Sequence, residues 1–295
     1  MEYQQLSNGV QIPVLGYGVY QIPQEDTARC VTDALACGYR LIDTAQSYFN
    51  EEQVGDGIKA SGVPRDEIFL TTKVWIEHYG HGPTRRSVEE SLRKLRTNYL
   101  DLVLLHRDFS DVYGAWQDLE DLLAEGTVRA IGVSNFMPDR LVDLCSFANV
   151  RPMVNQIETH PLYQRDEDRV WMAKYGIAHE AWAPFGEGRG GLFTNPVLEE
   201  IGAQHGKSPA QVILRWDIQR GTIALPKSVR RERMEQNADV FDFELSEQDM
   251  ARIADLDTKT SSFFSFRDPA MVEWFAHMVE ERKAGSVAAN EKKAW

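Results

Sequence analysis

The sequence predicts an α/β fold, a (β/α)8 TIM barrel with an N-terminal β-hairpin and a C-terminal extension. Eight short apolar runs with strand character recur along the chain, and segments with helical spacing separate them. This alternation is typical of a parallel sheet covered by helices. Eight such units with no change of composition between the two halves favour a closed barrel over an open doubly wound sheet, and no stretch rich in Gly, Ser or Pro divides the chain. With 295 residues, 43% of them hydrophobic, the chain can bury one large core, and we expect a single domain over residues 1–295.

The hairpin is expected within residues 1–14. Alternating residues flank the pair Asn8-Gly9, which favours a type I′ turn. The barrel strands follow at intervals that leave room for other elements between them. We expect these strands at residues 15–18, 39–42, 68–74, 102–105, 130–133, 153–157, 177–182 and 223–225.

Apolar residues at helical spacing predict helices between the strands. Pro83 and the pair Ser208-Pro209 stand where helices commonly begin. We expect helices at residues 26–37, 84–96, 113–124, 138–147, 166–175, 196–204, 208–219 and 231–236. The C-terminal extension, residues 258–295, starts with a segment rich in Ser and Phe. A helix over residues 268–281 and a frayed tail are expected after it.

Charge and composition disfavour several classes of partner. The net charge of −13 argues against nucleic acid and anionic membranes. No apolar run approaches the roughly 18 residues that span a bilayer, and no secretory signal is visible at the N-terminus. Cys30 and Cys37 lie seven residues apart on an expected helix, which is too far for a disulfide. We expect a soluble, monomeric, cytoplasmic protein with reduced thiols.

Four residue types that suit proton transfer fall at the ends of consecutive strands. Asp43 ends the second strand, with Tyr48 in the loop after it, while Lys73 lies near the end of the third strand and His106 ends the fourth. Taken singly, Asp43 could cap a helix, Lys73 could reach solvent and His106 could be a core residue. In a (β/α)8 barrel, however, functional residues lie at the carboxyl ends of the strands. Their convergence on one rim therefore favours a catalytic site.

These four residues fit the reduction of a small carbonyl substrate. A free phenol, with a pKa near 10, is a poor acid at neutral pH, but a lysine ammonium beside Tyr48 would lower that pKa. A buried Lys73 needs a counter-charge, which Asp43 can supply. A neutral His106 could donate a hydrogen bond to the carbonyl while Tyr48 delivers a proton. A nicotinamide cofactor would provide the hydride, and the mechanism requires no metal.

Six motifs then carry a resemblance. In this order and spacing, DTAQSY, TTKVW, LLH, GVSNF, NQIETHP and LPKS closely resemble the aldo-keto reductase family, from the hairpin to about Asp257. The resemblance implies a (β/α)8 barrel that uses NADPH to reduce aldehydes and ketones. It implies Tyr48 as the proton donor, with Lys73 and Asp43 tuning it and His106 orienting the carbonyl. The tryptophan after the seventh strand and the EGRGGLF loop look most like the bacterial branch that includes 2,5-diketo-gluconate reductases.

The resemblance also implies the residues at the nicotinamide end of the cofactor. Ser134, Asn135 and Gln156 would hold the carboxamide, and the ring of Trp182 would stack on the nicotinamide. The segment that follows would line the cofactor with Ala183, Pro184, Phe185, Gly186, Gly188 and Leu192. Its glycines formally match G-x-G-x-x-G, but no helix follows directly, as the doubly wound dinucleotide motif requires. A glycine-rich loop that folds over the pyrophosphate suits these residues better.

A basic segment points to the phosphate end. Four cations lie within seven residues of an acidic protein: Lys227, Arg230, Arg231 and Arg233. A helix that begins near Ser228 or Val229 would offer free N–H groups to an anion, although a solvated basic helix face is the alternative. In the family, the positions of Lys227, Ser228 and Arg233 hold the 2′-phosphate, and those of Gln236 and Asn237 meet the adenine. The cofactor-binding segment also includes Pro226 and Val229. NADPH rather than NADH is the predicted cofactor.

The substrate end departs from the family. After the histidine, relatives often have a polar residue and then proline, whereas this chain has Arg107-Asp108-Phe109, a charge pair that could alter the substrate range. The aromatic residues of the C-terminal extension could line an apolar pocket mouth or could simply pack the extension on the barrel. We expect the substrate to be bound by Tyr20, Trp75, His106 and Phe109, with Phe263, Phe264 and Phe266 as further candidate walls.

Two other functions remain as alternatives. One is a cofactor-binding module that senses redox state or regulates a partner, with little turnover. The other is a lyase or aldolase that uses Lys73 as a Schiff base. The intact set of Asp43, Tyr48, Lys73 and His106 favours the reductase. A metal site near residues 77–81 is disfavoured, because no carboxylate or cysteine partner can be assigned from the sequence.

Overall fold

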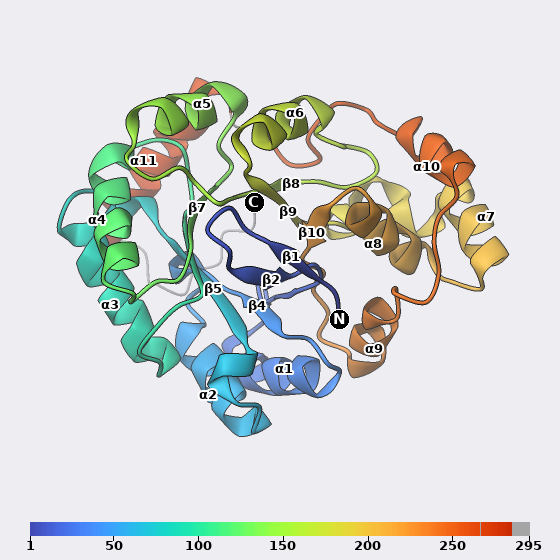
Figure 1. The fold of residues 1–295 in the computed structure, drawn as a ribbon, viewed down its shortest axis with the longest axis horizontal. Helices are drawn as coiled ribbons and strands as arrows, with labels where there is room; N and C mark the ends of the chain where they lie inside the picture. Colours follow the sequence, from blue (N-terminus) through green and yellow to red (C-terminus); the bar gives the residue numbers. More distant parts are fainter. Residues whose placement is uncertain (266, 285–295) are drawn as a thin grey trace.

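Eight parallel strands form the centre of the molecule, and helices surround them (Figure 1). The computed structural model describes residues 1–265 and 267–284. The sheet runs in the order β10-β9-β8-β7-β6-β5-β4-β3. It closes where Leu15 bridges to Ala224, with the Gly16 N–H donating to the Ala224 carbonyl at 2.9 Å. The strands are β3 (Tyr17–Gly18), β4 (Leu41–Asp43), β5 (Phe69–Val74), β6 (Leu102–Leu105), β7 (Ile131–Ser134), β8 (Val154–Glu158), β9 (Ala178–Trp182) and β10 (Thr222–Ala224).

The predicted strands are confirmed to within two residues at each end. The reason is visible in β5, whose six residues are all buried. Parallel strands in a barrel are covered on both faces, so they appear in the sequence as continuous apolar runs. The polar residues that interrupt such a run must therefore have a role inside the barrel.

The outer layer consists of helices, most of which were predicted. They are α1 (Gln24–Ala36), α2 (Glu51–Ser61), α3 (Pro83–Leu95), α4 (Val112–Ala124), α5 (Pro138–Phe147), α6 (Asp166–Tyr175), α7 (Pro196–His205), α8 (Pro209–Gln219), α9 (Arg231–Ala238), α10 (Glu247–Ala254) and α11 (Pro269–Lys283). One-turn 3-10 helices are η1 (Gln46–Tyr48), η2 (Arg65–Glu67) and η3 (Ile76–His78), and η4 covers Gly186–Thr194. No helix among the described residues is long and apolar enough to cross a membrane.

The sequence analysis missed α2 and α10. Gly55 and Gly57 weaken the helical signal of α2, because glycine disfavours helix interiors. In the structure, a Cβ at Gly55 would lie 2.8 Å from the Leu95 carbonyl carbon, and one at Gly57 would lie 2.6 Å from the Ala28 carbonyl oxygen. These glycines allow α2 to approach its two neighbours closely. Ser246 begins α10 with a capping box, a signal that was present in the sequence.

The predicted hairpin is present, but its predicted turn type is wrong. Strands β1 (Tyr3–Gln5) and β2 (Gln11–Pro13) pair antiparallel. Gly9 has a φ of 90°, whereas Asn8 is not among the described residues with positive φ. A type I′ turn needs positive φ at both positions, so this is a longer loop with one left-handed glycine. The hairpin lies across the near opening of the barrel (Figure 1), where Asn8 Nδ2 donates to the Arg129 carbonyl at 2.9 Å.

The C-terminal extension leaves the barrel and returns to it as a helix. The prediction of a helix over residues 268–281 is confirmed by α11, whose N-cap Asp268 accepts the backbone N–H of Ala270. Phe275 of α11 is buried against Trp75, with ring centroids 5.8 Å apart. The extension therefore packs on the rim that carries the strand-end residues. The predicted frayed tail lies outside the described residues.

Candidate active site

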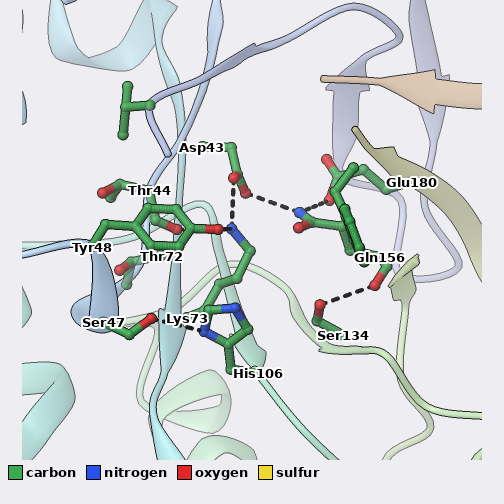
Figure 2. Close-up of polar contacts among 12 residues, drawn as sticks. Asp43, Thr44, Ser47, Tyr48, Thr72, Lys73, His106, Ser134, Gln156 and Glu180 are labelled. Carbon is green, nitrogen blue, oxygen red and sulfur yellow. Dashed lines mark hydrogen bonds and ion pairs between the residues drawn. The ribbon is translucent and has the colours of Figure 1, made fainter. Parts of the chain in front are cut away.

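Lys73 is the centre of a buried hydrogen-bonded cluster at the carboxyl ends of β4 and β5 (Figure 2). Asp43 pairs with Thr71, and Lys73 lies two residues beyond Thr71, so both charged side chains point to one side of the sheet. Lys73 Nζ donates to Asp43 Oδ1 at 2.6 Å and to the Tyr48 hydroxyl at 3.3 Å. It also donates to the Thr44 carbonyl at 3.0 Å. Strand register and the turn after β4 thus bring together three of the four residues predicted to be catalytic.

Tyr48 is positioned by the short helix η1 after β4. Gln46 Oε1 accepts the backbone N–H of Trp75 at 2.9 Å, and Gln46 Nε2 donates to two serine hydroxyls of α3 at 3.1 and 3.2 Å. These bonds fasten the loop to the end of β5 and to α3. The Tyr48 ring then packs against the ring of Tyr20, with centroids 4.8 Å apart. Gln46 therefore helps to hold the phenol beside the lysine.

The pKa of Tyr48 differs from the prediction in its net direction. Burial raises the pKa of the phenol above its usual 10.0, and the positive charge of Lys73 lowers it without cancelling that effect. Burial likewise lowers the pKa of Lys73, but Asp43 and Tyr48 raise it, and the net shift is upward. Tyr48 therefore carries its proton at neutral pH, and Lys73 is charged. The sequence revealed the lysine but not the degree of burial.

His106 completes the predicted set at the end of β6. Burial lowers the pKa of the imidazole well below its usual 6.5, and the charges of Arg107 and Lys73 lower it further, so the ring is neutral. Its Nδ1 lies 3.5 Å from the Ser47 hydroxyl, and its ring meets the Trp75 indole edge-on with centroids 5.0 Å apart. No described residue hydrogen-bonds to Nε2. That atom is available to a ligand.

Glu180 is a buried member of this cluster that the sequence analysis missed. Gln156 Nε2 donates to Asp43 Oδ2 at 2.9 Å and to Glu180 Oε2 at 2.7 Å (Figure 2). Burial, and then repulsion from Asp43, raise the pKa of Glu180 to about 8, so it is neutral at pH 7. Glu180 lies two residues before Trp182 on β9 and hence on the same side of the strand. The signal in the sequence that could have revealed Glu180 was an acidic residue in the middle of a predicted strand.

The residues predicted to hold a nicotinamide carboxamide come together on neighbouring strands. Ser134 Oγ donates to the Gln156 carbonyl at 2.9 Å, and Asn135 Nδ2 donates to Ser134 Oγ at 2.9 Å. Asn135 Oδ1 accepts the indole N–H of Trp182 at 2.9 Å. No described residue donates to Gln156 Oε1. A flat indole beside a ring of amide and hydroxyl groups fits a nicotinamide.

The glycine-rich loop after β9 has the backbone freedom that the prediction requires. Residues 183–185 lead into η4, where φ is 56° at Gly186 and 82° at Gly188. A Cβ at Gly188 would meet nothing within 4 Å. Leu192 is fully buried in the same apolar cluster as Leu198, so the structure does not expose it to a cofactor. The accessible part of this loop is its glycine-rich half.

The basic segment after β10 is exposed, but its helix begins later than predicted. The expected start near Ser228 or Val229 is wrong, because Arg230 is the N-cap of α9. The Ser228 hydroxyl accepts the Arg230 backbone N–H at 3.1 Å and forms a turn before the helix. Arg231 pairs with Glu235 at 3.0 Å. The other residues predicted for this end of the cofactor are Pro226 and Asn237, which are buried, and Lys227, Arg233 and Gln236, which are exposed.

Arg233 is a cation of this segment that could meet an anionic ligand, as the resemblance implies. Within the described residues it makes no ion pair, and its side chain is exposed. An exposed guanidinium beside the loop that ends a barrel strand fits a phosphate group. Arg231, two residues earlier in α9, is by contrast paired with Glu235 at 3.0 Å and lies 3.7 Å from a carboxylate oxygen of Asp33.

The predicted substrate-binding residues surround the Tyr48 hydroxyl and His106. Tyr20 and Trp75 contact these two residues directly, while Phe109 packs on Phe275 with ring centroids 5.5 Å apart. Phe263 lies against Trp182, the residue predicted to stack on the nicotinamide, at 5.2 Å between ring centroids. Phe266 lies outside the described residues. Packing of the extension on the barrel is thus visible in the contact of Phe109 with Phe275, and the lining of a substrate pocket stays a prediction.

The loop at residues 77–81 has acidic neighbours that the sequence did not reveal. His81 Nδ1 lies 2.9 Å from Asp118 Oδ1, and Asp121 is also close. However, Asp118 Oδ2 already accepts the backbone N–H groups of Gly82 and Arg85 at 2.7 and 2.8 Å. Asp118 therefore has a structural role at the start of α3.

Comparison with known proteins confirms the resemblance seen in the motifs. The aldo/keto reductase family model matches residues 14–258. The glyoxal reductase of Bacillus subtilis is 48% identical over 250 residues, which cover 84% of this chain and 90% of that protein.

Solved structures agree. The Bombyx mori aldo-keto reductase in complex with NADP superposes with a TM-score of 0.86 at 33% identity, covering 92% of this chain and 96% of that one. A protein described as a 2,5-diketo-D-gluconic acid reductase B has a TM-score of 0.86 at 36% identity, covering 90% and 95%. The predicted (β/α)8 barrel and the likeness to the 2,5-diketo-gluconate reductase branch are confirmed.

Proposed function

Because the chain belongs to the aldo/keto reductase family of oxidoreductases, we propose that it reduces small aldehydes or ketones with NADPH. The observation that carries the proposal is the contact of one buried lysine with both Asp43 and the Tyr48 hydroxyl, beside a neutral His106. This arrangement offers a proton and a hydrogen-bond donor to one carbonyl oxygen.

Tyr48 donates its proton to the carbonyl oxygen as that oxygen gains negative charge. The phenolate that remains is stabilised by Lys73 Nζ at 3.3 Å, and Asp43 keeps the lysine charged. His106 orients the carbonyl through Nε2: with the ring proton on that atom, Nδ1 can accept from the Ser47 hydroxyl, which lies 3.5 Å away. Because burial raises the pKa of Tyr48, the phenol keeps its proton until negative charge develops on the carbonyl oxygen.

NADPH supplies the hydride when it is bound. The carboxamide end would be held by Ser134, Asn135 and Gln156, and the ring by Trp182. Arg233, Lys227 and Ser228 would hold the 2′-phosphate. Two findings support NADPH: the free guanidinium of Arg233 among the described residues, and the similarity to the Bombyx mori protein, which is in complex with NADP.

A Schiff-base function for Lys73 is disfavoured by its surroundings. Three oxygen atoms accept hydrogen bonds from Nζ, which is fully buried. Burial lowers the pKa of this lysine, but Asp43 and Tyr48 raise it above its usual 10.5. A nucleophilic lysine must be neutral, and these partners stabilise the charged form.

Steady-state oxidation of NADPH with a panel of small aldehydes tests the reaction. We expect turnover of several aldehydes, since the site provides the proton donor and the carbonyl-binding group. Binding of NADPH without oxidation across the whole panel would favour a cofactor-binding module instead.

Fluorescence titration tests the cofactor. We expect tighter binding of NADPH than of NADH, and a loss of NADPH affinity on the order of tenfold in Arg233→Ala. Arg231→Ala is the matched control, because that guanidinium is already paired with Glu235. Equal affinity for the two cofactors, or equal losses in the two variants, would contradict the proposal.

A further inference from the structure

Trp75 brings two arginines next to the reaction centre. Its indole follows β5, is 1% exposed and meets the His106 ring edge-on. The Arg107 guanidinium carbon lies 5.7 Å from the indole centroid, and that of Arg282, from the last turn of α11, lies 5.8 Å from it. Two cations from distant parts of the chain thus share one aromatic ring beside a predicted catalytic residue.

Two buried donors at this place have no acceptor among the described residues. Trp75 Nε1 and Arg282 Nη1 are both buried, and neither makes a hydrogen bond with a described residue. Leaving a buried donor without an acceptor costs free energy, so most such groups in folded proteins are paired. Both open atoms are donors. The missing partner is therefore an acceptor.

Arg107 adds a fixed positive charge. It is 7% exposed and is stacked on Phe275, 4.8 Å from the ring centroid, while the Tyr79 hydroxyl bonds to its backbone N–H and carbonyl, both at 2.9 Å. Burial raises the pKa of Tyr48 and lowers that of His106, and the charge of Arg107 lowers both. The guanidinium is thus close enough to influence the reaction centre electrostatically.

Two acids lie near these arginines, Glu77 and Asp108, and neither forms an ion pair with them within the described residues. Glu77, whose pKa responds to Arg282, lies 3.3 Å from His78 Nε2, and Arg282 makes no ion pair within the described residues. Arg140, the cation next to the Asp108 backbone, pairs with Asp143 at 3.1 Å. In a protein with a net charge of −13, the two arginines place positive charge beside Trp75, on the rim of the site.

We propose that Trp75, Arg107 and Arg282 form a subsite for a carboxylate on the substrate, so that this chain prefers carbonyl compounds that carry a carboxylate. The inference rests on the proposed carbonyl reduction and adds the substrate class. A carboxylate accepts several hydrogen bonds and pairs well with guanidinium groups. The competing explanation is that the arginines only fasten α11 to the barrel by stacking.

A matched pair of substrates separates the two explanations. 4-Formylbenzoate and 4-formylbenzamide have the same shape, and only the first is charged. We expect the wild-type protein to show the higher kcat/KM with 4-formylbenzoate. In Arg107→Met this preference should fall on the order of tenfold, through KM for the charged substrate. Arg107→Lys should keep most of the preference, and Arg282→Met should lose part of it.

Arg140→Met is the control, since Arg140 pairs with Asp143 rather than lying on Trp75. Its ratio of kcat/KM values should equal that of the wild-type protein. Equal losses with both substrates in Arg107→Met would show that Arg107 only fastens α11, and would overturn the inference.

Calorimetric binding of 4-(hydroxymethyl)benzoate to the NADP complex tests the subsite without turnover. We expect binding to weaken on the order of tenfold in Arg107→Met. Unchanged binding would overturn the subsite, whatever the activity. If binding weakens as expected but neither aldehyde is reduced, the subsite stands and the proposed reduction fails.

Discussion

The reaction centre and the mouth of the site are built in different ways. At the centre, strands and the turns that follow them supply the residues, and the charged groups are paired: Lys73 donates three hydrogen bonds, and Gln156 Nε2 donates to both Asp43 and Glu180. At the mouth, the segment after β5, the loop after β6 and α11 supply the residues, and buried donors of Trp75 and Arg282 have no acceptor within the described part of the chain. Strands fix the chemistry of a barrel, and loops adapt its specificity. The contrast indicates that the centre determines the rate and the mouth selects the substrate.

The largest effect is expected from removing the proton donor. In Tyr48→Phe, kcat should fall about 10²–10⁴-fold, the usual contribution of general acid catalysis, because the phenylalanine has no proton to give. Binding of NADPH, followed by fluorescence, should change little. A variant that keeps more than about a tenth of wild-type turnover would show that Tyr48 is not the main acid.

The next effect tests whether Lys73 and Asp43 depend on each other as a buried ion pair. Lys73→Met leaves Asp43 buried without its ion-pair partner, so the free energy of unfolding should fall by about 3–5 kcal/mol. Adding Asp43→Asn should recover much of that stability, since no buried charge then lacks a partner, while activity stays low. Urea unfolding measures the stability of the single and the double variant. A double variant as unstable as the single one would contradict the pairing.

Glu180 offers a smaller, pH-dependent test of the same unit. Burial and Asp43 raise its pKa from 4.5 to about 8, against opposing effects of Gln156 and Lys73. The folded chain therefore binds a proton that the unfolded chain releases above pH 4.5. The stability from this group is present below that pH and is lost as the pH rises through about 8. Glu180→Gln should thus gain stability relative to wild type between about pH 5 and about pH 9. Parallel urea-unfolding profiles would contradict this.

The smallest effect compares two buried tryptophans. Trp116 Nε1 donates to the Val150 carbonyl at 2.9 Å, whereas Trp75 Nε1 has no acceptor among the described residues. Both side chains are 1% exposed. Trp116→Phe should therefore lower the free energy of unfolding by about 1–2 kcal/mol more than Trp75→Phe, because it leaves the Val150 carbonyl without its donor. Equal losses in thermal or urea unfolding would mean that the indole at the mouth is not an open donor.

Much of the centre could be predicted from the sequence, because apolar runs mark the strands and the polar residues that end them. Asp43 and Lys73 fall at the ends of consecutive apolar runs, and parallel pairing then places them together. The net pKa shift of Tyr48 could not be predicted, because it depends on burial that only the folded chain defines. The helix α2 was hidden by Gly55 and Gly57, which are needed for close packing. Single-domain organisation over residues 1–295 and the monomeric state stay predictions.

The mouth was less predictable than the centre. The pair Arg107-Asp108 stood out in the sequence, but nothing there showed that Arg282, far along the chain, approaches the same indole. Contacts between a loop and a C-terminal helix depend on tertiary packing, which no local pattern encodes. Specificity was therefore the part of the function least accessible from sequence.

The most direct test of this division measures kcat/KM for 4-formylbenzoate and 4-formylbenzamide in the wild-type protein, Tyr48→Phe and Arg107→Met. We expect Tyr48→Phe to lower both values by the same large factor and leave their ratio unchanged. Arg107→Met should change the ratio and leave the value for the amide nearly intact. A changed ratio in Tyr48→Phe, or an unchanged ratio in Arg107→Met, would contradict the separation of chemistry from selection.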